Sequence, residues 1–190
     1  MVSCHVERPL DDDAWSRFER LQQRRPGGFA VIALVRPPDE AHGEDEARWL
    51  ERARAAAARG PFGLHTHWTS PTHARPTGGD PAARVRRDVE WMRERGLDPR
   101  YFCGGGWYTD EAVRAVVAEL DLVDCTPRVG EPSPGMLPTT HSLGALARAL
   151  ARPLPRYVHA YFHDYDLLDV RRRYAVPVAL AVLGRRAVKI

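Results

Sequence analysis

Three potential metal ligands, Glu7, His65 and His67, lie in or directly after segments that are typical of β-strands. In an extended chain, residues i and i+2 point to the same side, so the imidazoles of His65 and His67 can both reach one ion. A carboxylate oxygen of Glu7 as the third ligand leaves an open position for water or substrate, as catalytic sites require. Zinc suits imidazole and carboxylate ligands, and other divalent ions fit as well. The HxH spacing alone does not favour a metal site over the alternative, in which both histidines only hydrogen-bond to loops. With Glu7 and His163 expected at the same rim, a metal site is favoured.

A further candidate, His163, follows the strand-like segment 157–162 and precedes Asp164 and Asp166. In parallel α/β folds the C-terminal ends of the strands share one face, so we expect His5 and His163 to lie near the predicted metal site. A histidine in this place can act as a general acid toward a leaving group. Asp164 or Asp166 can orient that histidine or cap the next helix, and we expect at least one of them to be a cap.

Three consecutive glycines follow the strand-like segment 101–103. Glycine lets a backbone approach a ligand closely or make a tight turn. The motif GxGxxG is absent, so a dinucleotide site is not indicated. Aromatic side chains beside the glycines can stack on a sugar, and packing against neighbouring loops is the alternative. The candidate substrate-binding residues are Trp68, Gly105, Trp107 and Tyr108.

The elements that must position these residues alternate between strands and helices. A continuous apolar run at 29–35 is typical of a strand that is buried on both faces. Aspartates before 14–25 predict a helix cap, and glycines after 59 and 95 predict helix ends. Strands are expected at 2–6, 29–35, 62–67, 101–103, 122–126 and 157–162; helices are expected at 11–25, 44–59, 81–95, 111–120 and 143–151.

The C-terminal part is less regular, because Pro177 interrupts the apolar segment 176–183. We expect an edge strand or a final helix there, after a last helix or turn that carries Arg171 to Arg173. The alternation as a whole predicts an α/β fold with a mainly parallel sheet. Six or so strands are too few for an eight-stranded barrel, so an incomplete barrel and an open doubly wound sheet remain.

Composition narrows the class of protein. A chain of 190 residues is typical of one domain, and we expect residues 1–190 to form a single one. The net charge is +3, but most arginines sit beside acids in helical segments, which indicates solvated helix faces and no nucleic-acid partner. No apolar run would span a membrane and no secretory signal is visible, so a cytoplasmic location is expected. The cysteines lack CxxC spacing and are expected to be free, with Cys103 a buried thiol.

The order of these motifs resembles the polysaccharide deacetylase superfamily, also called the NodB-homology or carbohydrate esterase family 4. That family has an acidic motif after its first strand, then a histidine motif, a glycine-containing loop and a late histidine. The corresponding segments here are Cys4-His5-Val6-Glu7, the segment 63–68 (GLHTHW), the segments 88–96 and 99–102, the segment 107–126, and Phe162-His163.

The resemblance implies a distorted (β/α) barrel with fewer than eight strands and metal-dependent removal of an acetyl group from a sugar. It assigns Glu7, His65 and His67 as metal ligands and His163 as the catalytic acid. His5 takes the place of the aspartate that serves the family as catalytic base, and imidazole can also accept a proton near neutral pH. The sequence departs from the family where Cys103 replaces an arginine and where Thr69 replaces the second histidine, so that His67 must substitute for it.

Three functions remain from the sequence. The first is a zinc-dependent hydrolase that acts on an acetylated carbohydrate or a related small amide. The second is an amidohydrolase or PHP-type phosphoesterase, although the HxH pair of those folds normally lies on the first strand. The third is a catalytically degenerate domain that binds carbohydrate or a partner protein. Neither the substrate nor the oligomeric state follows from the sequence.

Overall fold

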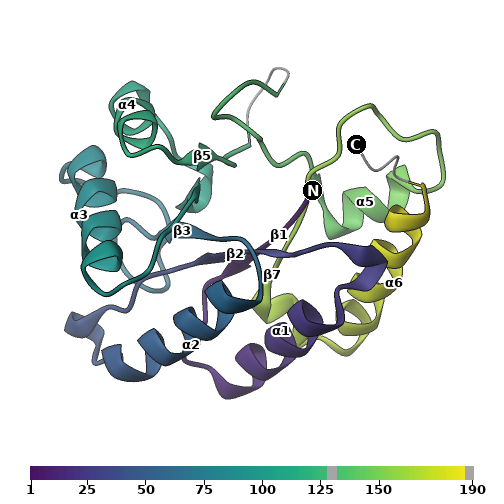
Figure 1. Cartoon of the computed structure of the whole chain (residues 1–190), viewed down its shortest axis with the longest axis horizontal. Coiled ribbons are helices and arrows are strands. Elements are labelled where there is room, and N and C mark those ends of the chain that lie inside the picture. Colours follow the sequence, from purple (N-terminus) through teal and green to yellow (C-terminus); the bar gives the residue numbers. More distant parts are fainter. Residues whose placement is uncertain (128–131, 187–190) are drawn as a thin grey trace.

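The computed structural model describes residues 1–127 and 132–186. Within these residues the strands form one parallel sheet with the order β5-β4-β3-β2-β1-β7-β6, which curls into a half-barrel (Figure 1). The predicted fold, a distorted and mainly parallel barrel with fewer than eight strands, is therefore confirmed. The strands are β1 (Val2–Val6), β2 (Ile32–Val35), β3 (Phe62–Thr66), β4 (Tyr101–Gly104), β5 (Val123–Asp124), β6 (His141–Ser142) and β7 (Ala160–His163).

Helices follow most of the strands, and several begin at a side chain that accepts a backbone N–H bond. Asp11, Asp45, Asp80, Asp110 and Ser142 cap five of them in this way. Short 3-10 turns occupy Pro26–Gly28 (η1), Glu40–His42 (η2), Gly105–Trp107 (η3) and Asp164–Leu167 (η4). The α-helices are α1 (Asp12–Arg24), α2 (Glu46–Arg59), α3 (Pro81–Glu94), α4 (Glu111–Glu119), α5 (Leu143–Ala149) and α6 (Val170–Arg186).

The two faces of the sheet differ in chemistry. On β1, Val2, Cys4 and Val6 belong to the large apolar core that also contains the buried side chains of the helices. The residues between them, Ser3 and His5, point to the other side, as the strand period requires. Strand β2 is apolar on both faces, which agrees with its continuous apolar run. The inner face of the half-barrel is thus where polar side chains converge.

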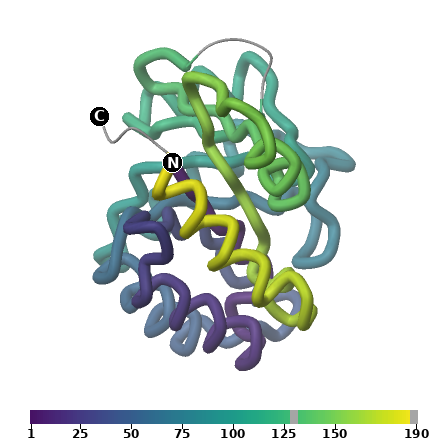
Figure 2. Tube along the Cα trace, turned by 90° about the vertical axis from the view of Figure 1, so that its right-hand side faces the viewer, coloured from purple at the N-terminus to yellow at the C-terminus, as the bar shows by residue number. Residues whose placement is uncertain are grey.

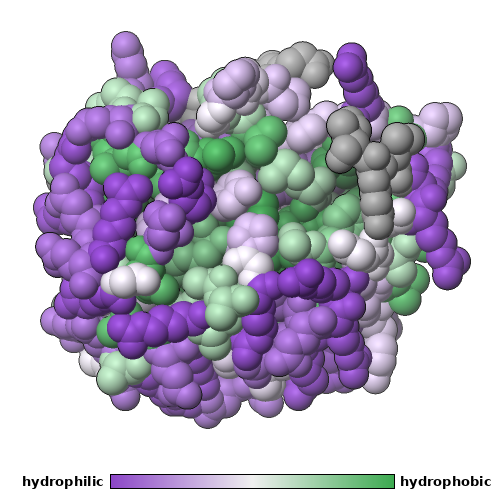
Figure 3. Space-filling model, in the orientation of Figure 1, coloured by the Kyte–Doolittle hydropathy of each residue, from purple (hydrophilic) through white to green (hydrophobic). Residues whose placement is uncertain are grey.

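The outer surfaces of the helices are hydrophilic. Figure 3 shows hydrophilic residues along the lower and left edges of the molecule, where α1, α2 and α3 lie. Arginines on these helices pair with acids of neighbouring elements, as in Arg86 with Glu119 at 2.7 Å and Arg95 with Glu46 at 2.7 Å. In the described part of the chain, none of the helices has the length and apolar character that a membrane span requires.

The segment 176–183 is part of α6. Of the two predicted structures for this segment, an edge strand and a final helix, the helix is the one observed. Its buried residues are Val176, Ala179, Leu180 and Leu183, and this spacing places them on one face of a helix. Helix α6 contacts η1 and runs beside α1 (Figure 2).

The strand β6, at the sheet edge, was not predicted. The backbone N–H groups of Thr140 and His141 both donate to the carbonyl of His159, a contact between distant residues.

Replacing Asp88 by asparagine should stabilise the fold at neutral pH. The carboxylate lies on the buried side of α3, with Arg84 at 2.9 Å, and burial raises the pKa of Asp88 to about 6. A carboxyl group with a raised pKa in the folded state takes up a proton on folding, so stability falls as pH rises from about 4 to about 6. We expect a gain of about 1–2 kcal/mol in the unfolding free energy at pH 7, measured by urea denaturation.

The same series of urea experiments between about pH 4 and 7 checks the cause, because the variant should lose the part of the decline in stability that Asp88 contributes. A variant that keeps the full decline would show that another buried group is responsible.

Candidate metal centre

The C-terminal ends of β1, β3 and β7 deliver the candidate residues to one place. His5 pairs in register with His163 on the neighbouring strand β7. His65 lies on β3, two strands away from β1 in the other direction. The rings of His5 and His65 are nevertheless only 4.7 Å apart, because the curl of the sheet turns inner-face side chains toward one another. The prediction that distant histidines converge at this rim holds in the structure.

One oxygen of Glu7 lies among three imidazoles. Its Oε1 is 3.3 Å from Nε2 of His65 and 3.6 Å from Nε2 of His67. The Nε2 atom of His163 is also 3.6 Å from the same oxygen. The ligand atoms of Glu7, His65 and His67 all lie within 4.8 Å of one another. Zinc bonds of about 2.0–2.1 Å place tetrahedral ligands about 3.3 Å apart, so this trio has the dimensions of a metal site.

The Nδ1 atoms of His65 and His67 set the tautomer of each neutral ring. Nδ1 of His65 lies 3.0 Å from the carbonyl oxygen of Cys103, and Nδ1 of His67 lies 2.9 Å from that of Pro71. A carbonyl can only accept a hydrogen bond, so both Nδ1 atoms carry hydrogen and donate. The Nε2 atom of each neutral ring then presents a lone pair toward the carboxylate of Glu7. Carbonyl partners of this kind commonly orient histidine ligands of metals.

The charges at the centre favour a bound cation. Burial opposes the ionisation of Glu7, but its contacts with the rings of His65 and His67 outweigh it and hold the pKa of Glu7 far below its ordinary value. Burial lowers the pKa of His65, so its neutral form dominates at neutral pH. A carboxylate and neutral imidazole lone pairs repel at these distances unless a proton or a cation lies between them. The buried Nε2 of His67 makes no hydrogen bond within the described residues.

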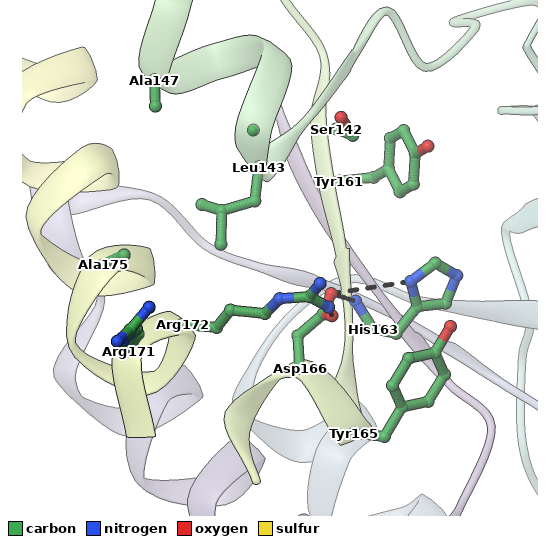
Figure 4. A pocket seen from close by; sticks show the side chains of 11 residues that line it. Ser142, Leu143, Ala147, Tyr161, His163, Tyr165, Asp166, Arg171, Arg172 and Ala175 are labelled. Carbon is green, nitrogen blue, oxygen red and sulfur yellow. Dashed lines mark hydrogen bonds and ion pairs between the residues drawn. The ribbon is translucent and has the colours of Figure 1, made fainter. Parts of the chain in front are cut away.

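His163 has a separate polar partner, Asp166, shown in Figure 4. Oδ2 of Asp166 accepts the backbone N–H of His163 at 2.9 Å and lies 3.6 Å from its Nδ1. Arg172 donates to the other carboxylate oxygen at 2.5 Å. Burial alone would raise the pKa of Asp166, but hydrogen bonds from His163 and Arg172 lower it. Asp166 is therefore a carboxylate that orients His163 and also caps the turn η4.

Asp164 contacts the backbone and has no contact with the ring of His163. Its two carboxylate oxygens accept the N–H groups of Glu7 at 3.2 Å, Arg8 at 2.8 Å and Tyr165 at 2.9 Å. Burial raises the pKa of Asp164 to about 6, against these donors, which favour the carboxylate. This side chain joins the end of β1 to the end of β7 and so holds Glu7 and His163 at a fixed separation.

His5 is enclosed by aromatic rings. The ring centroids of Tyr161, Trp107 and His163 lie 5.3, 5.3 and 5.2 Å from that of His5, in addition to His65 at 4.7 Å. Neither ring nitrogen of His5 has a hydrogen-bond partner among residues 1–127 and 132–186. Burial, with the nearby His65, lowers the pKa of His5 well below its ordinary value. The imidazole is therefore neutral and able to accept a proton or to bind a cation.

The predicted substrate-binding residues fall into two groups. Trp68 donates to the carbonyl of Gly105 at 3.0 Å and packs edge-on against Tyr108, with centroids 5.4 Å apart. At Gly105 a Cβ would lie 2.3 Å from the carbonyl oxygen of Thr66, so this close backbone approach requires glycine. These three residues brace the loop beside the centre. Trp107, which is 36% exposed, contacts His5 and can meet a ligand.

A cavity of about 570 Å³ opens beside His163 (Figure 4). Tyr161 also borders the centre, where its ring lies 4.9 Å from that of Trp107. Tyr161, Arg171 and Arg172 are not among the predicted site residues, and the only sequence signal for the arginines is their run before an apolar helix. The cavity is lined by Ser142, Leu143, Gly144, Ala147, Tyr161, His163, Tyr165, Asp166, Arg171, Arg172 and Ala175.

Comparisons with known proteins find similarity in structure alone. No family model matches the sequence, and no curated protein matches it either. A family 4 carbohydrate esterase from Streptomyces lividans, in complex with acetate, aligns with a TM-score of 0.60 and 14% identity over 97% of this chain and 86% of that one. The chitin deacetylase from the fungal pathogen Colletotrichum lindemuthianum aligns with a TM-score of 0.63 and 15% identity over 98% of this chain and 83% of that one. The chain therefore shares its fold with a family 4 carbohydrate esterase and with a chitin deacetylase.

Proposed function

We propose that this chain is a metal-dependent hydrolase that removes an acetyl group from an acetylated carbohydrate or a related small amide, with zinc as its ion. The two similar structures support this class of reaction, since one is a chitin deacetylase and the other holds acetate. The observation that carries the proposal is the arrangement of Glu7 Oε1 against the Nε2 lone pairs of His65 and His67 at 3.3 and 3.6 Å. A divalent cation converts this repulsion into coordination.

Glu7, His65 and His67 fit the ion in number, spacing and chemistry, and they would hold it. When bound, the ion supplies a Lewis acid for the acyl oxygen and a lowered pKa for water. Strands β1 and β3 fix the three side chains before any ligand arrives. The carbonyls of Cys103 and Pro71 keep both imidazoles in the orientation that the ion requires.

His5 and His163 divide the proton transfers. His5 lies beside the proposed ligands, with its ring 4.7 Å from that of His65, and it takes the place of the aspartate base of the family. His163 borders the large cavity and is oriented by Asp166, which suits donation of a proton to the leaving amine or alcohol. The carboxylate of Asp166 fixes the orientation of the His163 ring for that transfer.

The substrate's sugar would occupy the cavity beside His163. Tyr161 and Tyr165 line it and Trp107 lies next to it, so aromatic side chains border the space for sugar rings. Ser142 adds a hydroxyl group. Trp68, Gly105 and Tyr108 act one layer behind, where they set the position of Trp107.

Elemental analysis and an acetate-release assay test this function. We expect about one zinc per purified chain and release of acetate from N-acetylated amino-sugar oligomers or acetylated esters. Chelation should remove the zinc and abolish the release of acetate. The double variant His65→Ala, His67→Ala should lose the ion and the activity. The matched control is the double variant His42→Ala, His73→Ala, which removes two exposed histidines and should retain both properties.

Three results would contradict the proposal. Equal metal content in the two double variants would place the ion elsewhere. Metal-loaded protein that leaves acetylated substrates intact but releases phosphate from phosphoesters would favour the phosphoesterase alternative, and protein that binds sugar without hydrolysing either class would favour a binding domain.

A further inference from the structure

We propose that the chain has a second, deeper cation site, formed by His5, His65 and Cys103, which takes a thiophilic ion such as Cd²⁺ or Cu⁺ in exchange for the ion at Glu7, His65 and His67. The deeper set lies on the inner face of the half-barrel, on β1, β3 and β4. It does not depend on hydrolytic activity, and it differs from the outer set in its sulfur ligand.

The geometry of the three side chains is that of a ligand cluster. Their ligand atoms, one nitrogen from each ring and the Sγ of Cys103, lie within 4.8 Å of one another. Cys103 is the register partner of His65 on the adjacent strand, so the two side chains lie next to each other on the same face. His5 reaches them across the curl of the sheet, with its ring 4.7 Å from that of His65. Bonds of about 2.0–2.3 Å to a cation would draw these atoms closer together.

The state of His5 points independently to a ligand. Its side chain is fully buried, and in the described part of the chain both ring nitrogens are without a hydrogen-bond partner. Buried polar groups in native proteins are almost always satisfied, so an imidazole left without any partner calls for an explanation. A cation bound to one nitrogen supplies that partner.

The chemistry of the cluster selects a soft ion. A thiolate with two imidazoles prefers Zn²⁺, Cd²⁺ or Cu⁺ to hard cations. Sγ of Cys103 has a long contact with the carbonyl oxygen of Gly104, at 3.9 Å. Burial raises the pKa of the Cys103 thiol well above its ordinary value, so an ion that binds here must displace the thiol proton. The rings of Trp107 and Tyr161 cover His5 and exclude water from the ion.

The two sites compete because they share His65. A neutral imidazole has one lone pair, so His65 coordinates one ion at a time. The outer set offers oxygen and nitrogen, whereas the deeper set offers sulfur and nitrogen. A thiophilic ion is therefore expected to displace zinc from the outer set and to occupy the deeper one at the same total of one ion per chain.

Cadmium titration of the metal-free full chain tests the proposal, because a sulfur-to-cadmium charge-transfer band in the ultraviolet reports a thiolate ligand directly. We expect the band to saturate at one Cd²⁺ per chain. Cys103→Ser should abolish it and weaken Cd²⁺ binding by more than about 100-fold, beyond the range for outer-shell partners. Cys4→Ser and Cys125→Ser, which alter the other two buried thiols, should retain it.

Further variants separate the deeper site from the outer one. His5→Ala should weaken the band. Glu7→Gln removes only an outer ligand and should leave the band intact. The band therefore tests the deeper site even if the proposed hydrolase activity is not found. In zinc-loaded protein, Cd²⁺ should release one zinc for each cadmium bound. A band that survives Cys103→Ser in folded protein, or that is absent from wild-type protein, would overturn the site. Simultaneous binding of one zinc and one cadmium would overturn the exchange.

Discussion

Replacing His163 by alanine should lower kcat for acetyl release by two to four orders of magnitude, about the contribution of a general acid, while the metal content stays at the wild-type value. The ring borders the substrate cavity, and its Nε2 lies 3.6 Å from Glu7 Oε1 at the metal centre. Asp166 lies on the other side of the ring, 3.6 Å from Nδ1. Steady-state kinetics and elemental analysis of the same preparation measure the two properties together.

Two controls separate proton donation from metal binding and from orientation. His42→Ala removes an exposed histidine that pairs only with Asp39 and should change neither quantity. Asp166→Asn keeps an oxygen that can accept the backbone N–H of His163 but loses the charge, so we expect a smaller loss of kcat than in His163→Ala. The variant should also shift the pH profile of kcat. Loss of the ion in His163→Ala would show that His163 is a ligand and not the acid.

Much of the fold is predictable because its signals are local. The helix that starts after Asp11 has a capping side chain and buries Trp15, Phe18 and Leu21 at helical spacing. The strand at 29–35 was predicted too long, and the structure begins β2 at Ile32 after the turn η1. Strand boundaries depend on which neighbours are available for pairing, and a single sequence does not contain that information.

The C-terminal third shows where local signals fail. Pro177 made a strand as plausible as a helix, yet the apolar spacing through Leu183 was already helical. Strand β6 has two residues, and its position depends on hydrogen bonds to the carbonyl of His159, 18 residues beyond His141. No periodic pattern marks a strand of that length.

The grouping of the candidate residues at one rim was predictable, and the distances between them were less so. The HxH pair and the acid at position 7 identify potential ligands from their types, and the rule for strand ends brings them to one rim. The distances depend on the curl of the sheet, which no local pattern encodes. No local pattern shows which of the predicted aromatic residues contacts the centre. Trp68 and Tyr108 pack against each other, whereas Trp107 contacts His5. The pairing of His65 with Cys103 likewise follows from strand register.

Replacing Asp164 by alanine should lower both the stability of the fold and the metal affinity of the centre. The carboxylate accepts backbone N–H bonds from Glu7, Arg8 and Tyr165, and it is fully buried. Bonds to a charged acceptor contribute about 1.5–3 kcal/mol each and are not additive, so we expect a loss of about 2–4 kcal/mol in unfolding free energy. Because Glu7 is then less well fixed against His65, zinc affinity should fall at least about tenfold.

The reason for the double effect is that Asp164 links two strand ends, each of which carries a residue of the centre. Asp169→Ala is the matched control, since Asp169 accepts one backbone N–H from Arg172 at the start of α6. That variant should cost about 1 kcal/mol, as the loss of a helix cap does, and should leave zinc affinity unchanged. Asp164→Asn, which retains one accepting oxygen, should fall between the two and remains informative if the alanine variant does not fold. Wild-type zinc affinity in a destabilised but folded Asp164 variant would mean that the strands alone position Glu7, and that the carboxylate serves only the fold.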